Sequence, residues 1–300
     1  MAVPAPPTSA RDKLVRPLLA ILVASIFTVC NTAQAGGLDL AKAGLAAQQH
    51  GDWDQALQLY GQALDAGDLT PQTQARVLGL RANAYGVKGL YDKAKADFSA
   101  AIEVTPNDPA PYVGRSIVYR QMGDYSRAVA DDDAAITLKP DYDFAYTNRG
   151  LAEFYAGQFA MAAEDFAKSQ AADPGEPDFV LWLHISRARA GQDDKDELAR
   201  NAAKVDPERW AGPAVALFLD RIKPEDLPAK AADENPTFKR QQGCEASFYL
   251  GEYALLRGRT DEAKHLFQSV LDDCALYKTT YAYFSQVYGA AKEELKRIGD

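Results

Sequence analysis

The sequence has 300 residues, a formal net charge of -9, 47% hydrophobic residues and 25% charged residues. This composition is ordinary for a globular protein, and the length allows about two domains. Because Lys and Arg do not cluster, nucleic acid and anionic lipid surfaces are not expected partners.

The N-terminal segment is typical of a secretory signal peptide. Residues 11–16 carry three basic side chains, and an apolar run follows at residues 17–29. That run is too short for a stable membrane span, and Ala33 and Ala35 supply the small-x-small pattern that signal peptidase reads. We therefore expect residues 1–35 to be removed near Ala35 and the mature chain to be exported to the periplasm.

Cys30 leaves a second reading of this leader open, because lipoprotein signals end in a cysteine. A small residue precedes the cysteine in those signals, whereas Val29 precedes it here. The match is poor, so we expect ordinary cleavage near Ala35 and no lipidation of Cys30.

Three segments of the chain repeat one skeleton at an interval of 34 residues, aligned on Ala94, Ala128 and Ala162. Fixed positions around each alanine hold a small residue, a glycine, an aromatic residue, a second small residue and a proline: Ala82, Ser116, Gly150; Gly89, Gly123, Gly157; Tyr91, Tyr125, Phe159; Ala101, Ala135, Ser169; Pro106, Pro140, Pro174. The glycine suits a turn with left-handed backbone, small residues let two helices approach closely, and the proline follows the second helix. With apolar residues at helical spacing in between, each copy is predicted to be a helix-turn-helix hairpin.

Further copies of the skeleton flank these three. Residues 48–67 hold one, aligned on Ala56, and Gly44 lies twelve positions before that alanine. Residues 177–207 read as a degenerate hairpin with Gly191 at its turn, and residues 250–271 hold another copy. The skeleton resembles the tetratricopeptide repeat (TPR), a hairpin that stacks into a superhelix. The expected fold is all-α: a TPR superhelix with a helical C-terminal cap.

The period breaks after residue 206. Trp210 and Pro213 precede one short helix, Pro224 opens another, and a block from Cys244 to Cys274 follows. This order of TPR array, W-x-x-P helix and FYLGEY repeat resembles exported TPR proteins related to new lipoprotein I (NlpI). The resemblance implies an all-α homodimer of the bacterial envelope that acts as a non-enzymatic adaptor for proteases and cell-wall hydrolases.

These patterns divide the chain into three parts. Residues 1–35 are the signal peptide, and residues 36–206 are the N-terminal TPR array. Residues 207–300 hold the helical connector, the last TPR and a capping helix. That last helix has an apolar face formed by Phe284, Val287, Tyr288, Ala291, Leu295 and Ile298. Either the face covers the end of the solenoid or it forms a dimer contact.

Cys244 and Cys274 are the cysteines that follow the leader. They lie at the start of the first helix and the end of the second helix of the last hairpin. Antiparallel helices bring those ends together, and an even number of cysteines in an exported protein favours a disulfide over a reduced, buried pair. Metal binding is not expected, since no histidine lies beside them.

Arginine recurs at one position of the repeat, as Arg81, Arg115 and Arg149. These side chains form either a basic stripe on the surface or framework ion pairs with acids of the next helix, such as Asp97 or Asp131. The framework interpretation is favoured, because such pairs are common between packed helices. Asp132 and Glu153 replace aromatic residues of the neighbouring copies and weaken packing locally.

No catalytic pattern is present. His50, His184 and His265 have no metal-ligand spacing, and the acids of residues 131–133 point in different directions on a helix. Nucleophile elbows, phosphate-binding glycine loops and CxxC pairs are absent from the sequence. We expect no enzymatic activity, no cofactor and no metal site.

A concave groove is expected along the first helices of the hairpins, suited to an extended peptide or a partner helix. Counting along those helices predicts that it is lined by Arg76, Asn83, Val113, Ile117, Arg120, Thr147, Asn148, Leu151 and Tyr155. Asn83 and Asn148 either bond a peptide backbone or make contacts within their own helices. The expected function is a scaffold in the bacterial cell envelope that binds periplasmic proteins, such as a protease or peptidoglycan hydrolases. The alternative is a structural subunit of an envelope secretion or outer-membrane assembly complex.

Overall fold

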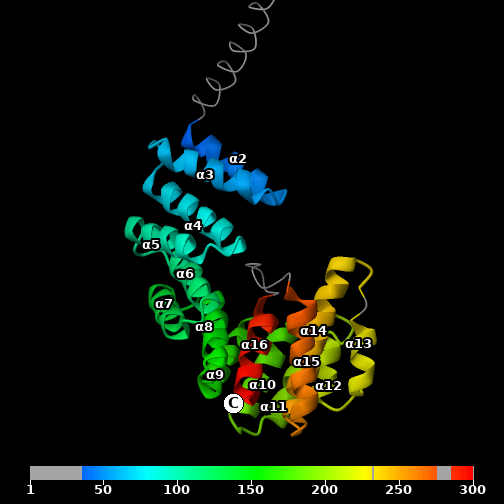
Figure 1. Ribbon diagram of the computed structural model, residues 1–300. Coiled ribbons are helices and arrows are strands. Elements are labelled where there is room, and N and C mark those ends of the chain that lie inside the picture. Colours follow the sequence, from blue (N-terminus) through cyan, green and yellow to red (C-terminus); the bar gives the residue numbers. More distant parts are fainter. Residues whose placement is uncertain (1–35, 232, 276–284, 300) are drawn as a thin grey trace, which may run out of the picture. The chain divides into compact units, whose positions relative to one another are not determined.

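The computed structural model describes residues 36–231, 233–275 and 285–299 (Figure 1). Every regular element in these ranges is a helix, which confirms the expected all-α fold. Among these helices, none is long and apolar enough to cross a bilayer. The expected signal peptide at residues 1–35 and Phe284 lie outside the described residues. The chain forms two compact units that meet between Thr73 and Gln74.

The first unit is a single hairpin followed by the start of the next helix. Helix α2 (Gly37–Gln49) packs against α3 (Trp53–Asp65). The two backbones approach closely because Gly44 has no side chain, and a Cβ there would lie 2.7 Å from the ring of Tyr60. Asp52 caps α3, since its carboxylate accepts a hydrogen bond from the backbone N–H of Gln55.

The second unit begins within α4 (Pro71–Val87) and continues as stacked hairpins. Its array comprises α5 (Tyr91–Val104), α6 (Ala110–Gln121), α7 (Tyr125–Leu138), α8 (Asp143–Tyr155), α9 (Phe159–Ala172), α10 (Pro177–Arg189) and α11 (Lys195–Ala202). The turn glycines between paired helices adopt left-handed backbone, as at Gly89, Gly123 and Gly157, with φ of 72°, 80° and 78°. The helix-turn-helix repeat predicted from these glycines is confirmed.

The recurring arginines are framework residues. Arg81, Arg115 and Arg149 each donate two hydrogen bonds to an aspartate sixteen residues later, with shortest distances of 2.7 Å. The acceptors are Asp97, Asp131 and Asp165. Arg115 also donates to Ser99, and Arg149 to Asp133, so these two arginines tie each hairpin to the preceding one. The framework interpretation is confirmed.

The remaining helices complete the second unit. They are α12 (Gly212–Phe218), the 3-10 helix η1 (Pro224–Asp226), α13 (Leu227–Lys230), α14 (Pro236–Leu255), α15 (Thr260–Asp273) and α16 (Ser285–Gly299). One hydrophobic core runs from Leu151 in α8 to Ala291 in α16, centred on Trp182, whose ring packs against Phe154 and Phe248. This core continues across residue 206, so the part of the predicted array from Leu151 onward shares it with residues 207–300.

The two cysteines lie where antiparallel helices place them. Cys244 of α14 and Cys274 at the end of α15 are buried, and a disulfide joins them across a Cα–Cα distance of 6.1 Å. The bridge closes a loop with a sequence separation of 30 residues. Because α14 begins at Pro236, Cys244 lies near the middle of that helix and not at its start as expected, so the bridge ties the middle of α14 to the end of α15.

Helix α14 provides a matched test of the close-packing role of glycine. A Cβ on Gly251 would lie 2.5 Å from the ring of Phe267, whereas one on Gly243 would meet nothing within 4 Å. Gly251→Ala is therefore expected to lower the free energy of unfolding by about 1–3 kcal/mol through overpacking. Gly243→Ala should raise it by about 0.5–1 kcal/mol, because alanine favours helix. Urea unfolding checks both, and equal effects would contradict the packing argument.

Candidate functional site

The C-terminal helix α16 packs against the hairpin array as well as against α14 and α15 (Figure 1). Arg297 donates hydrogen bonds to the backbone carbonyls of Phe154 (2.8 Å) and Tyr155 (2.5 Å) at the end of α8. In return, the Tyr155 hydroxyl donates to the carbonyl of Gln286 at 2.5 Å. On the face predicted to be apolar, Val287 is buried within the core. The helix therefore covers the core, as the capping interpretation expected.

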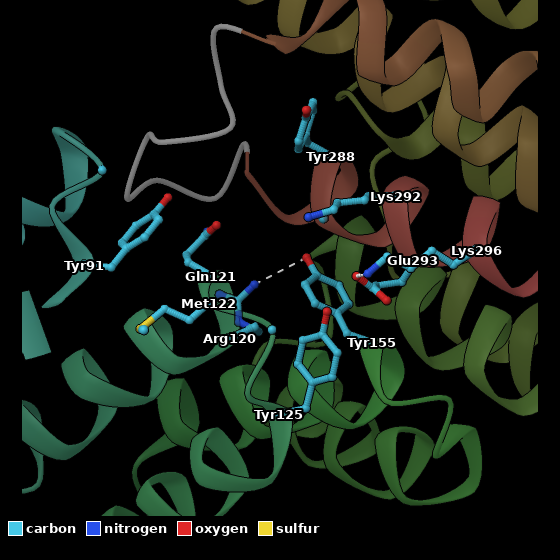
Figure 2. Close-up of a pocket in the computed structure, with 13 residues that line it drawn as sticks. Tyr91, Arg120, Gln121, Met122, Tyr125, Tyr155, Tyr288, Lys292, Glu293 and Lys296 are labelled. Atoms are coloured by element: carbon cyan, nitrogen blue, oxygen red, sulfur yellow. Dashed lines mark hydrogen bonds and ion pairs between the residues drawn. The ribbon is translucent and has the colours of Figure 1, made fainter.

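A pocket of about 490 Å³ lies where α16 meets the array. We call it the α6–α16 pocket; Figure 2 shows the side chains around it, which come from the N-terminus of α5, the end of α6, the start of α7, the end of α8 and one face of α16. Its aromatic residues are Tyr91, Tyr125, Tyr155 and Tyr288, and its charged residues are Arg120, Lys292, Glu293 and Lys296.

Arg120 is the buried cation of this pocket, with 5% of its surface exposed. Its Nη1 donates a hydrogen bond to the Tyr155 hydroxyl at 3.3 Å, and its guanidinium lies 5.3 Å from the centre of that ring (Figure 2). Its Nε is buried and has no hydrogen-bond partner among the described residues. Arg120 thus makes no hydrogen bond to a carboxylate there.

Asp132 is a fully buried acid that interacts electrostatically with Arg120. Burial raises the pKa of Asp132 well above its usual range, although a hydrogen bond from Ser116 and the charge of Arg120 oppose the shift. Ser116 donates that hydrogen bond over 2.5 Å, and the second carboxyl oxygen has no partner among the described residues. A raised pKa favours a neutral Asp132, which leaves the charge of Arg120 largely uncompensated.

Glu293 is the acidic side chain that lines the pocket. It forms an ion pair of 2.7 Å with Lys296. Burial, followed by a hydrogen bond with Glu293, raises the pKa of the Tyr125 phenol. Tyr125 therefore remains a neutral hydroxyl that shares Glu293 with Lys296, while Lys292 is exposed and makes no ion pair in the described structure.

Most of the nine residues predicted to line a groove lie inside the fold instead. Val113 and Ile117 belong to a small core cluster, and Leu151 is fully buried. Their apolar side chains pack between neighbouring hairpins, so the expectation that they face a partner is corrected. Counting residues along each helix predicted that these side chains lie on an inner face. It could not show that adjacent helices cover that face.

The predicted polar residues divide between internal contacts and the surface. Buried Thr147 bonds Ser169 at 2.9 Å, and Asn148 donates to the Phe144 carbonyl at 2.7 Å, which is the contact within its own helix left open above. Both are therefore corrected as groove residues. Arg76 is exposed and Asn83 is half-buried, so a binding role for these two stays a prediction.

Arg120 and Tyr155 are the predicted groove residues that line the α6–α16 pocket. Sequence reasoning missed Lys292, Glu293 and Lys296, which face them from α16, and placed Tyr288 only on the apolar face of that helix. The spacing of the lysines, four residues apart on one helix face, was the available signal. It could not identify the surface on which the helix docks.

The underside of α16 is held by buried charges. Arg189 of α10 donates to Glu252 of α14 at 3.2 Å and to Glu294 of α16 at 2.7 Å, and both acids are fully buried. Burial, and then the charge of Glu294, raise the pKa of Glu252 to about 8. Arg189 therefore joins three helices and pairs with two buried carboxylates, of which Glu294 is also paired with Arg297.

Glu153 provides a pH-dependent test of burial in α8. Burial and the nearby charge of Asp165 raise its pKa from 4.5 to about 8, and one carboxyl oxygen has no partner among the described residues. Because the folded state binds this proton more tightly than the unfolded chain, stability is lost as pH rises through this interval. The contribution has a slope of up to ~1.4 kcal/mol per pH unit.

Glu153→Gln is expected to remove that slope. The variant should be more stable than the wild type above the raised pKa, and the difference should shrink toward the ordinary pKa of a glutamate. Urea unfolding across this range measures the difference, with exposed Glu103→Gln as the control. A constant difference between variant and wild type at all pH values would contradict the raised pKa.

Catalytic or metal-binding geometry does not emerge from the described residues. No group of three or more His, Cys, Asp or Glu side chains there is placed to hold a metal ion. His184 bonds Asp194 at 2.8 Å within the hairpin of α10 and α11. What the described site offers is cations, phenol hydroxyls and aromatic faces, which are groups for binding.

Comparison with known proteins identifies the repeat. Residues 80–143 match the family model of the tetratricopeptide repeat. A solved tetratricopeptide repeat protein from Parabacteroides merdae ATCC 43184 is similar over 88% of this chain and 99% of its own, with 15% identity and a TM-score of 0.55. These findings confirm the TPR-type fold.

Two further solved structures are also similar to the chain. YrrB, described as a TPR protein with an unusual peptide-binding site, has 17% identity and a TM-score of 0.49, covering 65% of this chain and 97% of its own. PilW, a type IV pilus biogenesis factor, has 16% identity and a TM-score of 0.48, covering 88% and 98%. The relationship to new lipoprotein I stays a prediction.

Proposed function

We propose that this TPR protein is a non-enzymatic adaptor of the bacterial cell envelope, which binds peptide segments or helices of periplasmic proteins. A TPR array is typically a protein-interaction scaffold, so the fold supports the general role. The proposed partners are a periplasmic protease or peptidoglycan hydrolases, which the adaptor would hold beside their substrates. Its contribution would be effective concentration, without chemistry of its own.

The observation that carries the proposal is the α6–α16 pocket. It combines exposed side chains from successive hairpins with a buried arginine whose guanidinium makes one hydrogen bond to the described residues. A purely structural array would gain more stability from filling this junction with apolar residues. Convergent polar groups on an open, aromatic-lined surface are instead typical of a recognition site.

The expected signal peptide and the disulfide support the envelope as the proposed compartment. The leader pattern at residues 1–35 and the pairing of Cys244 with Cys274 fit an oxidising compartment, since disulfides persist in the periplasm. The second candidate is a structural subunit of an envelope secretion or outer-membrane assembly complex. Fixed stoichiometry distinguishes that role from an adaptor with several weaker partners.

Affinity capture tests the proposed function. Residues 36–300 are immobilised, exposed to envelope extract with mild crosslinking, and the bound proteins are identified by mass spectrometry. Enrichment of a protease or a peptidoglycan hydrolase is the expected result. Recovery of one fixed transport or secretion complex would favour the structural subunit. Recovery of nothing above background would contradict both roles.

The same preparation tests the homodimer that the family resemblance implied. Sedimentation equilibrium of residues 36–300 gives the mass in solution. A mass twice that of the chain supports the dimer, and a single-chain mass over the whole concentration range contradicts it.

A further inference from the structure

We propose that the α6–α16 pocket binds a carboxylate group of an acidic peptide segment, with the Arg120 guanidinium as its central contact. The inference rests on the proposed adaptor function and names the partner chemistry that this site would recognise. It depends on three features of the pocket: the state of Arg120, the charges that α16 contributes, and the surrounding tyrosines.

Arg120 carries a buried charge that the described protein does not neutralise with a hydrogen-bonded carboxylate. Elsewhere in the repeat, Arg115 and Arg149 each bond an aspartate through two nitrogens. Among the described residues, the Arg120 guanidinium donates one hydrogen bond, to the Tyr155 hydroxyl, and its buried Nε has no partner. A buried guanidinium gains most from a carboxylate, because charge-assisted hydrogen bonds are the strong ones.

The C-terminal helix makes the pocket cationic although the protein is acidic. The lining residues include three cations (Arg120, Lys292 and Lys296) and one anion (Glu293), a formal charge of +2 from 3 - 1. The whole chain carries -9. This local positive charge attracts acidic peptide segments to the pocket and repels basic ones.

The lysines are placed to receive such a segment from solvent. Lys292 is exposed and points from α16 toward the array (Figure 2). Lys296 is exposed at 58% of its side chain and shares Glu293 with Tyr125. An incoming carboxylate can compete for exposed Lys296, and Glu293, whose side chain is 12% exposed, then keeps its hydrogen bond with Tyr125.

The tyrosines favour a peptide over a small inorganic anion. Tyr91, Tyr125 and Tyr288 are each partly exposed and surround the cations from α5, α7 and α16. Their rings offer apolar faces and their hydroxyls can bond backbone groups, a combination that suits peptide recognition. A pocket of about 490 Å³ accommodates more than an isolated carboxylate.

Affinity selection from a random hexapeptide library tests the inference. Residues 36–300 are incubated with two forms of the library, one with free C-terminal carboxylates and one with C-terminal amides. Bound peptides are sequenced by mass spectrometry, and the strongest binders are titrated by fluorescence anisotropy. The expected result is enrichment of Asp and Glu, or of free carboxyl termini. If enrichment is confined to the free-acid library, the pocket binds the C-terminal carboxylate. If Asp and Glu are enriched in both libraries, the pocket binds a side-chain carboxylate.

Arg120→Gln is expected to weaken binding of the strongest acidic peptide about tenfold or more, because it removes a charge-assisted hydrogen bond. The double variant Lys292→Ala/Lys296→Ala changes exposed residues alone and should also weaken binding of that peptide. It keeps the test valid if Arg120→Gln fails to fold. Lys230→Ala changes an exposed lysine of α13 outside the pocket and should leave binding unchanged.

The outcomes separate this inference from the proposed function. Selected peptides without acidic enrichment, or acidic peptides that bind all variants equally, would overturn the carboxylate site while leaving peptide binding intact. Selection of no peptide would overturn the site as well, and affinity capture would then decide the adaptor role independently.

Discussion

Replacing Arg189 with alanine is expected to lower the free energy of unfolding by about 3–5 kcal/mol, the typical cost of removing one partner from a buried ion pair. The change leaves the fully buried Glu252 without its ion-pair partner and leaves Glu294, also fully buried, with Arg297 as its remaining cation. It also removes the guanidinium that lies 4.4 Å from the centre of the Phe159 ring. Because these acids join α14 and α16 to α10, Arg189→Ala should mainly weaken the packing of the C-terminal helix α16.

The pH dependence of this effect follows from the same burial. The pKa of Glu252 is already raised to about 8 with Arg189 present, and removing that cation raises it further. The cost of Arg189→Ala should therefore grow as pH rises, because more of the carboxylate charge must be held without compensation.

Urea unfolding at acidic and alkaline pH measures this cost. Arg200→Ala is the control, since Arg200 is an exposed arginine of α11 and surface substitutions usually stay within about 0.5 kcal/mol. If Arg189→Ala were no more destabilising than Arg200→Ala, the three-helix contact would not hold α16.

Removing the disulfide is the second large effect expected. The double variant Cys244→Ala/Cys274→Ala should lose about 3–4 kcal/mol, the chain-entropy estimate for a loop of this length. The structure joins the two buried sulfurs across a separation of 30 residues. The unfolded chain without the bridge gains conformational freedom, whereas the folded hairpin keeps its helices.

Thermal unfolding with and without dithiothreitol separates this loss from the packing change of the substitutions. Reductant should lower the melting temperature of the wild type and leave the double variant unchanged. If full reduction, checked by thiol titration, left the melting temperature of the wild type unchanged, a stabilising role for the bridge would be contradicted.

The hairpins were predictable because their signals are local. Gly89, Gly123 and Gly157 end helices at a fixed interval, and each adopts the left-handed backbone that glycine allows. The ion pair of Arg115 with Asp131 was equally accessible, since a constant spacing of sixteen residues joins the two helices of one hairpin. Because the motif recurs in several copies, a position that is ambiguous in one copy can be assigned from the others.

The candidate site was predictable only in part, because it depends on a contact far apart in sequence. Tyr155 and Arg297 are separated by 142 residues, and no periodicity links them. The prediction of a groove treated the hairpins as an isolated array. In the structure Leu151 lies in the core, while α16 supplies three of the four charged residues that line the pocket, Lys292, Glu293 and Lys296.

Site-specific photocrosslinking tests most directly whether partners bind at the α6–α16 pocket. A photoreactive phenylalanine analogue is placed at Met122, which lines the pocket and is 42% exposed, or at Met161, which is 50% exposed on α9 outside it. Both proteins are irradiated in envelope extract. We expect protein adducts from Met122 that unlabelled residues 36–300 compete away, and none from Met161. Competed adducts from Met161 alone, or equal adducts from both positions, would contradict binding at the pocket.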